Sequence, residues 1–280
     1  MAAGNNRIAF LGPEGTFTEE ALLASRPDPS LNPFPHPTIR EVMEAVRSGD
    51  AALGIVPIEN SLEGSVAITL DLLAFDFDEL FICGETVHPI RHQLNTRSPV
   101  ALDQITKVIS HPHAYGQCRQ FLSTHLPGVE HEAANSTADA VRIVSRVDRP
   151  WAAIGNKLAA DMYECLVLRD NIEDSLENET RFVYLSTTPA PQDLDALYKT
   201  SLVCTIGADQ PGSLLLILSE FAHRYINLTK VESRPSREGL GKYIFFIDIE
   251  GRMTDPAVEQ ALKCLACKLP WVKVFGSFPT

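Results

Sequence analysis

Four short polar stretches of the chain contain residues of the kinds that bind anions or donate hydrogen bonds. The first is the turn Gly12-Pro13-Glu14-Gly15-Thr16-Phe17, where backbone N–H groups at a helix start can hold a carboxylate. This turn lacks the Gly-Lys-Ser/Thr of a phosphate-binding loop and the third glycine of a dinucleotide fingerprint. Alone, it indicates either an anion-binding turn or a simple strand-to-helix connection.

The second stretch follows an apolar strand predicted from Ala51 to Ile58. Glu59, Asn60 and Ser61 come directly after this strand. Proteins of the α/β class bind ligands at the carboxyl ends of their strands, so these side chains are candidates for substrate contacts. A polar turn with helix caps would explain the same residues without a ligand.

Two further stretches lie at strand ends. Ser110 ends a predicted strand, His111 and His113 follow it, and Gln117 lies one helical turn further along. The two histidines could form a catalytic pair, bind a metal ion or lie exposed at a helix N-terminus. The last stretch, Asn178–Phe182, contains a Thr-Arg-Phe tripeptide that is too common to indicate a function by itself.

These stretches need a scaffold, and the chain predicts two kinds. Residues 1–186 alternate strands with helices, which predicts α/β lobes with mainly parallel sheets. One predicted helix begins at Glu19 with Thr18 as its cap, and another is capped by Ser136 or Thr137 and continues to Val144. Two prolines within 187–193 mark a linker. Beyond it the order is βαββαβ in about 80 residues, which is typical of a ferredoxin-like module. The predicted domains are residues 1–188 and 198–280.

Composition narrows the function classes. The 280 residues include 36 acidic and 24 basic side chains, a net charge of −12, which disfavours nucleic-acid binding and also opposes an acidic metabolite. No apolar run reaches the roughly 18 residues of a membrane span, and the N-terminus lacks the pattern of a signal peptide. Six scattered cysteines, with a CxxC pair at Cys264 and Cys267 inside a predicted helix, favour idle thiols in the cytoplasm over a metal site.

Together, and in this order, the four stretches resemble the prephenate dehydratase family. The chain also resembles the ACT regulatory domain of those enzymes at Pro211-Gly212-Ser213-Leu214 and over the run from Ile226 to Pro235. The resemblance extends from Arg7 to Phe278. It departs from the usual pattern at Ser213, where alanine is common, and after Phe17. Since nothing at the N-terminus resembles a chorismate mutase domain, we expect a monofunctional enzyme.

The resemblance implies a two-lobed α/β catalytic domain, similar to type II periplasmic binding proteins, with a discontinuous first lobe and the site between the lobes. The implied reaction converts prephenate to phenylpyruvate, carbon dioxide and water without cofactor or metal. Thr180 is the implied catalytic group, donating a hydrogen bond to the leaving hydroxyl. The other implied catalytic residues are Asn60, Ser110, Gln117 and Glu59. The implied substrate contacts are Gly15, Thr16, Phe17, Ser61, Arg181 and Phe182. Arg181 would face a substrate carboxylate, with a structural salt bridge as the alternative.

The ACT resemblance implies allosteric control by phenylalanine and pairing of chains into a homodimer or homotetramer, with no nucleic acid or membrane as partner. The implied effector contacts are Pro211, Gly212, Ser213, Leu214, Asn227, Glu232, Ser233 and Arg234. Two alternatives stay open. The chain could be an arogenate dehydratase, because the sequence barely discriminates a keto from an amino side chain. It could also be a non-catalytic amino-acid sensor, although such a protein would be expected to lack Thr180.

Overall fold

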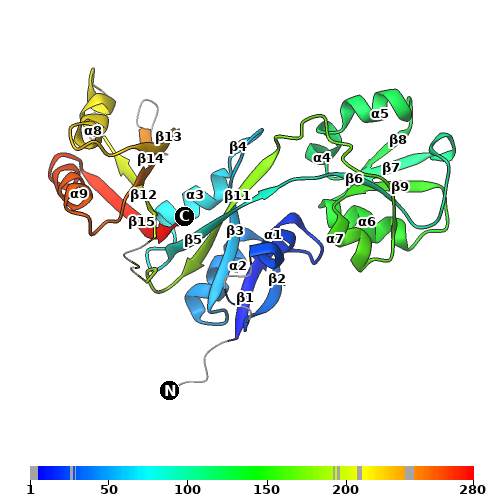
Figure 1. Ribbon diagram of the computed structural model, residues 1–280, viewed down its shortest axis with the longest axis horizontal. Helices are drawn as coiled ribbons and strands as arrows, with labels where there is room; N and C mark the ends of the chain where they lie inside the picture. Colours follow the sequence, from blue (N-terminus) through cyan, green and yellow to red (C-terminus); the bar gives the residue numbers. More distant parts are fainter. Residues whose placement is uncertain are drawn as a thin grey trace. The chain divides into compact units, whose positions relative to one another are not determined.

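The computed structural model describes residues 6–25, 28, 30–191, 193, 196–206, 210–236 and 243–280, and its strands form three sheets (Figure 1). The first sheet has the order β2-β1-β3-β11-β5, with β4 paired to β3. Its strands are β1 (Arg7–Leu11), β2 (Asn32–His36), β3 (Leu53–Asn60), β4 (Gly64–Ser65), β5 (Phe81–Pro89) and β11 (Glu179–Ser186). The helices in this part of the chain are α1 (Phe17–Ser25), α2 (Ile39–Ser48) and α3 (Ala67–Phe75).

The second sheet has the order β10-β6-β9-β7-β8 and is mixed, because β7 is parallel to β8 and β9 whereas β6 is antiparallel to β9 and β10. Its strands are β6 (Gln93–Thr96), β7 (Lys107–Ser110), β8 (Glu130–Ala133), β9 (Trp151–Gly155) and β10 (Leu166–Arg169). The helices are η1 (Leu102–Gln104), α4 (Pro112–Gly116), α5 (Arg119–His125), α6 (Thr137–Ser145) and α7 (Lys157–Met162). Figure 1 shows α6 beside β7 and β9, and Val141 packs there with Ile109 and Ala153 in one buried cluster.

The third sheet is antiparallel and has the order β13-β14-β12-β15. Its elements are β12 (Tyr198–Thr205), α8 (Ser213–Ala222), β13 (Leu228–Pro235), β14 (Tyr243–Glu250), α9 (Pro256–Lys268) and β15 (Trp271–Pro279). Alternate residues of the strands, such as Leu202 and Ile247, bury one face of this sheet against α8 and α9. The chain order confirms the predicted βαββαβ module.

Contacts divide the described chain into two compact units, the first made of residues up to 42, 55–66 and 87–182, and the second of residues 43–54, 67–86 and 183–280. Strands β3, β5 and β11 contribute residues to both units, so this division does not follow the predicted boundary near residue 188. The division into domains 1–188 and 198–280 stays a prediction.

Local predictions succeeded where a side-chain signal was strong. Ser136 caps α6 by accepting a hydrogen bond from the Asp139 N–H at 3.0 Å. The expected cap at Thr18 is wrong, because α1 already begins at Phe17 and the Thr16 carbonyl accepts the first helical hydrogen bond, from the N–H of Glu20. The sheets are also less parallel than expected. No helix in the described residues has the length and apolarity needed to cross a membrane.

Candidate active site

A cavity of about 430 Å³ lies within the first unit and is lined by residues from the parts of the chain that form the first and the second sheet. Those on the side of the first sheet include Thr16, Phe17, Asn60, Thr180 and Phe182. Those on the side of the second sheet include His111, His113, Gln117, Ser136 and Thr137. The lining therefore brings together polar residues from all four stretches that the sequence singled out.

The hydroxyl oxygen of Thr180 accepts a hydrogen bond from another side chain of the site. It lies on β11 with 8% of its surface exposed, and its Oγ1 accepts a hydrogen bond from Nδ2 of Asn60 at 2.9 Å. Asn60 is itself fixed, because its Oδ1 accepts from the backbone N–H groups of Leu62 and Glu63, both at 3.0 Å. Within the described residues no group accepts the Thr180 hydroxyl hydrogen, so this hydrogen is available to a molecule in the cavity.

A chain of side-chain amides continues from Asn60. Its Nδ2 also donates to Oδ1 of Asn178 at 2.8 Å, and Nδ2 of Asn178 donates to Oε1 of Gln117 at 3.0 Å. Nε2 of Gln117 donates to Oε1 of Glu63 at 2.8 Å, and the other Glu63 oxygen lies 2.7 Å from Nδ1 of His113. A carboxylate can only accept hydrogen bonds, so Glu63 fixes which end of the Gln117 amide carries the nitrogen.

Three members of this network were not among the expected site residues: Glu63, His92 and Asn178. His92 is 2% exposed, and its Nε2 lies 2.8 Å from Oε1 of Gln117. Burial lowers the pKa of this imidazole below its ordinary value, despite the opposing hydrogen bond to Gln117 and the nearby carboxylates of Glu173 and Glu63. His92 precedes a short strand and belongs to none of the motifs, so no spacing pattern distinguished it from a core histidine.

The glycine turn has a structural role alongside its position at the cavity. Gly15 has φ +84°, and a Cβ there would lie 3.3 Å from Cα and Cβ of Ala159, so glycine is required. Its N–H donates to Oε2 of Glu19 at 2.5 Å, and burial raises the pKa of this carboxyl. The amide expected to contact substrate thus holds a carboxylate of the protein itself, whereas Thr16 and Phe17 line the cavity.

Ser110 and Ser61 do not line the cavity as the structure describes it. Ser110 is fully buried, and its hydroxyl donates to the Ile154 carbonyl at 3.3 Å. The Ser61 hydroxyl donates to the Glu177 carbonyl and accepts from the Glu179 N–H, both at 3.0 Å. Both serines therefore hold backbone segments in place.

Arg181 and Glu59 also lie outside the described lining, and they form an ion pair with 3.5 Å between Nη1 and Oε2. Successive side chains of a strand point to opposite faces, so Thr180 and Phe182 line the cavity whereas Arg181 between them does not. The structure therefore favours the salt bridge that the sequence left as the alternative. The described lining contains no lysine or arginine.

The comparisons with known proteins agree with this arrangement. The model of the family "Prephenate dehydratase" matches residues 8–190, and that of the "ACT domain" matches residues 200–266. The chain belongs to the prephenate dehydratase family. It is 40% identical over 284 residues to the prephenate dehydratase of Mycobacterium marinum, covering 98% of this chain and 89% of that protein. The family membership inferred from six ordered motifs is confirmed.

Two solved structures resemble the whole chain. The crystal structure of prephenate dehydratase from Arthrobacter aurescens in complex with L-Phe has a TM-score of 0.88 and 38% identity, covering 98% of this chain and 90% of that one. GqqA, described as a novel type of quorum quenching acylase, has a TM-score of 0.86 and 29% identity, covering 98% and 97%. The family's α/β fold and the four-stranded ACT sheet are those expected from the sequence.

The expected effector residues lie on the ACT sheet and at the start of α8, where Gly212 has φ +88° and caps the helix ahead of Ser213 and Leu214. Nδ2 of Asn227 donates to Glu250 at 2.9 Å, and Glu232 lies 3.4 Å from Nζ of Lys230. Ser233 and Pro211 are exposed. These contacts leave the helix start and Ser233 accessible.

Arg234 makes a different contact from the one expected. Its Nη1 donates to Oδ1 of Asp71 on α3 at 2.7 Å and to the Ala67 carbonyl at 2.9 Å, and its Nη2 lies 3.4 Å from Oδ2 of Asp71. The side chains are 24% and 10% exposed. Arg234 thereby attaches strand β13 to a helix of the region that the dehydratase family model covers.

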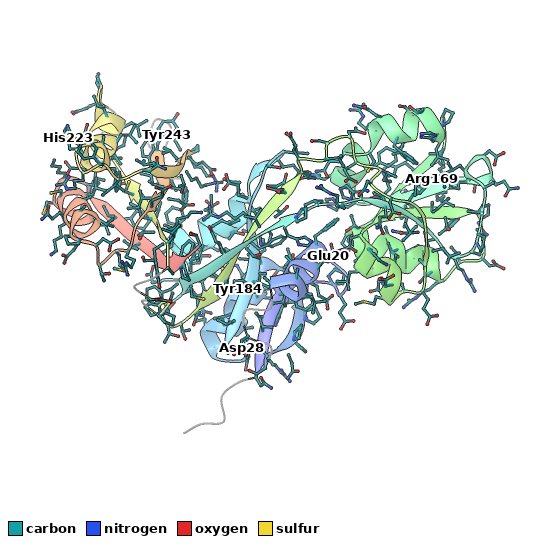
Figure 2. All side chains as sticks on the ribbon, viewed as in Figure 1. Glu20, Asp28, Arg169, Tyr184, His223 and Tyr243 are labelled. Carbon is teal, nitrogen blue, oxygen red and sulfur yellow. The ribbon has the colours of Figure 1, made fainter. Side chains whose placement is uncertain are left out.

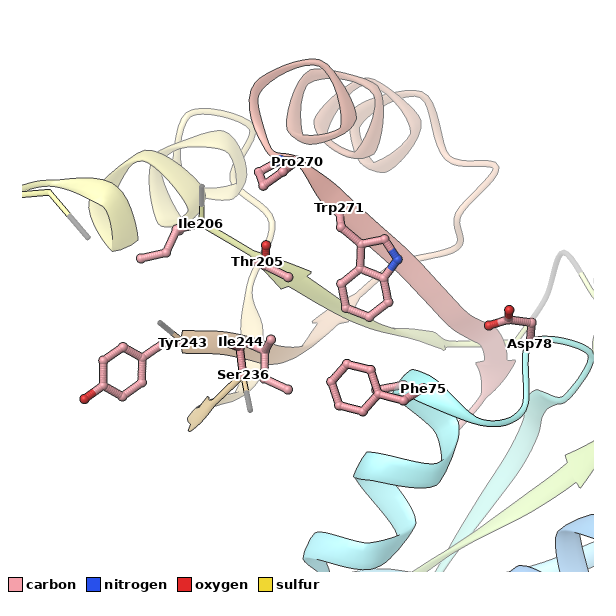
Figure 3. A pocket seen from close by; sticks show the side chains of 10 residues that line it. Phe75, Asp78, Thr205, Ile206, Ser236, Tyr243, Ile244, Pro270 and Trp271 are labelled. Atoms are coloured by element: carbon pink, nitrogen blue, oxygen red, sulfur yellow. The ribbon is translucent and has the colours of Figure 1, made fainter. Parts of the chain in front are cut away.

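The same face of the ACT sheet borders a second cavity, of about 590 Å³, within the second unit (Figure 3). The rings of Phe75 on α3 and Trp271 on β15 are stacked there with centroids 6.0 Å apart. At its edge Nζ of Lys273 donates to Asp78 at 2.6 Å. Tyr243, labelled in Figure 2, also lines this cavity.

Proposed function

We propose that the chain converts prephenate to phenylpyruvate, carbon dioxide and water. The observation that carries this proposal is the arrangement around Thr180, whose hydroxyl accepts from Asn60 and keeps its own hydrogen for a group in the cavity. Membership of the prephenate dehydratase family supports the same reaction.

The reaction needs a hydrogen-bond donor at the departing hydroxyl. The bond between the ring and its carboxylate breaks, its electron pair enters the ring, and the ring carbon–oxygen bond breaks, releasing carbon dioxide and hydroxide as the ring becomes aromatic. The hydroxide takes up a proton and leaves as water. Thr180 is too weak an acid to transfer a proton before this cleavage begins, but its hydrogen bond strengthens as charge develops on the leaving oxygen. The hydrogen bond from Asn60 polarises the hydroxyl and makes it a better donor.

The cavity must also hold two carboxylates in a protein of net charge −12. The first turns of two helices border it, with Thr16 and Phe17 at the start of α1 and Ser136 and Thr137 at the start of α6. Helix N-termini favour anions through free N–H groups and the helix dipole. Two such ends, together with His113, give the substrate's carboxylates separate places to bind without an arginine in the described lining.

The decisive experiment mixes the purified chain with prephenate and follows phenylpyruvate by its ultraviolet absorbance. Arogenate is tested in parallel, because conversion of arogenate to phenylalanine with prephenate left intact would make the chain an arogenate dehydratase. Product from neither substrate would overturn the proposal and favour an amino-acid sensor. An acylase assay on the substrates of GqqA is the matched comparison, and we expect no turnover there.

The proposal includes control by phenylalanine through the ACT domain, supported by the L-Phe complex of the Arthrobacter aurescens enzyme. In this chain the accessible start of α8 and Ser233 would take the amino acid, together with Asn227 and Glu232, whereas Arg234 would transmit its binding through α3. We also propose a cytoplasmic enzyme that assembles as a homodimer or homotetramer. Phenylalanine titration of the rate, with light scattering to give the molar mass, tests both parts.

A further inference from the structure

His92 contacts the amide network at the end opposite to Thr180. We propose that His92 is a positioning residue for the dehydratase reaction. Its uncharged ring, with the hydrogen on Nε2, donates to the Gln117 carbonyl. This hydrogen bond fixes the orientation of the Gln117, Asn178 and Asn60 amides and, through them, of the Thr180 hydroxyl. The inference rests on the proposed function, since it assigns a role in that same site.

The hydrogen-bond directions determine which ring nitrogen carries the hydrogen. Nε2 of Gln117 donates to the Glu63 carboxylate, so Oε1 of Gln117 must be the atom that faces His92. This oxygen accepts from Nδ2 of Asn178 and also lies 2.8 Å from Nε2 of His92. Two acceptors facing one another would repel, so Nε2 of His92 must be protonated and donate.

The other ring nitrogen explains why the ring stays uncharged. Nδ1 of His92 is buried and has no hydrogen-bond partner among the described residues. Adding a proton there would bury an unpaired N–H and a positive charge, both of which are costly. The carboxylates that act on the ring are those of Glu173, whose Oε2 accepts from the His92 backbone N–H at 2.8 Å, and of Glu63 beyond Gln117, but burial outweighs both.

Packing fixes the plane of the ring as well. The rings of His92 and Phe17 meet edge to face, with centroids 5.4 Å apart and an interplanar angle of 83°. Phe17 is the first residue of α1 and lines the cavity. His92 therefore connects the wall formed by α1 with the amides that lead to Thr180, and a ring in another orientation could not contact both.

The test compares two substitutions of His92. In His92→Gln the side-chain N–H can occupy the place of the imidazole Nε2–H, whereas His92→Leu removes the donor. We expect His92→Leu to lower kcat about tenfold or more with KM changed less than about threefold, and His92→Gln to recover most of kcat. His131→Leu is the matched control, because His131 stacks on Tyr115 and does not line the cavity, and it should keep kcat.

A spectroscopic measurement on the unmodified chain keeps the test independent of folding and of turnover. The ¹⁵N spectrum of the histidine rings at pH 7 should show His92 neutral with its hydrogen on Nε2, assigned by the resonance lost in His92→Gln. A charged ring, a hydrogen on Nδ1, normal kcat in His92→Leu, or equal loss in both variants would each overturn the inference. A chain with this tautomer but without prephenate turnover would instead refute the proposed function.

Discussion

The cavity of the first unit and the contact between α3 and the ACT sheet in the second unit use opposite kinds of polar interaction. Thr180, Asn60, Asn178 and Gln117 form a series of uncharged hydrogen bonds. On the face of the ACT sheet next to α3 and β5, ion pairs dominate: Lys199 with Glu85, Lys273 with Asp78 and Arg234 with Asp71. Amide hydrogen bonds have fixed donor and acceptor ends, whereas ion pairs tolerate many geometries and weaken with salt.

The difference indicates two tasks. A network with fixed donor and acceptor ends can orient one hydroxyl hydrogen toward the substrate, as the proposed chemistry at Thr180 requires. Ion pairs can hold two elements together while allowing them to shift. The two regions are joined covalently, because Asn60 ends β3, Glu63 follows it in the chain, and α3 begins shortly afterwards at Ala67.

The largest effect is expected from removing the hydroxyl on which the neutral network ends. Thr180→Val keeps the shape of the side chain but cannot donate to the leaving group. A preorganised donor of this kind contributes roughly 10²–10³ in rate, so kcat should fall by about that factor while the chain stays folded. Steady-state kinetics with prephenate measure the loss, and circular dichroism checks the fold. Thr180→Ser is the control and should keep much of the rate. A valine variant with normal turnover would remove Thr180 from the mechanism.

The next effect comes from reversing one hydrogen bond without removing it. Asn60→Asp replaces the donating amide nitrogen by an oxygen, so the Thr180 hydroxyl would turn and donate to the new carboxylate instead of to substrate. The added charge would also repel the dianion. We expect kcat to fall about 10- to 100-fold. Asn32→Asp, which adds the same charge on the exposed strand β2, should change kcat by less than about twofold. Similar losses in both variants would show that charge alone matters.

The ionic region should affect regulation more than basal turnover. Arg234→Met removes the contact with Asp71 and the Ala67 carbonyl, so we expect basal kcat/KM to stay within about threefold while the response to phenylalanine is largely lost. Calorimetry tells loss of coupling from loss of binding, because phenylalanine should still bind to the variant. The exchanged pair Arg234→Asp with Asp71→Arg should restore part of the response. A full response in Arg234→Met would contradict a role in coupling.

The sequence could predict the elements and motif residues whose signals are local. The Ser136 cap and the βαββαβ order follow from side-chain type and strand pattern, and Asn60 and Gln117 are candidates because they come after predicted strands. Thr180 is expected at the site only through the resemblance to the family. Contacts between distant segments could not be predicted this way. Asn178 is 118 residues from Asn60, and the pairing of Arg181 with Glu59 depends on which face of two neighbouring strands each side chain occupies. His92 carried no local signal, because its role comes only from its partner.

The smallest effect concerns the dependence of stability on pH. Burial lowers the pKa of His92, and also of His111 and His131, below the ordinary value. Since the folded chain resists protonation of these rings, the unfolded chain binds more protons once the pH falls below about 6.5. The contribution of these neutral rings to the free energy of unfolding should therefore be fully present near pH 7.5 and should decrease toward pH 5.5.

His92 should account for part of that decrease, because burial opposes protonation of its ring in the folded chain but not in the unfolded chain. Urea unfolding at the two pH values measures the change. In His92→Gln the decrease should be smaller than in the unmodified chain, since glutamine does not titrate. If the free energy of unfolding of His92→Gln decreased between the two pH values as much as that of the unmodified chain, the buried neutral ring of His92 would not contribute to the pH dependence of stability. The contrast between an uncharged amide network and an ionic ACT contact would then rest on the kinetics of Thr180 and Asn60 alone.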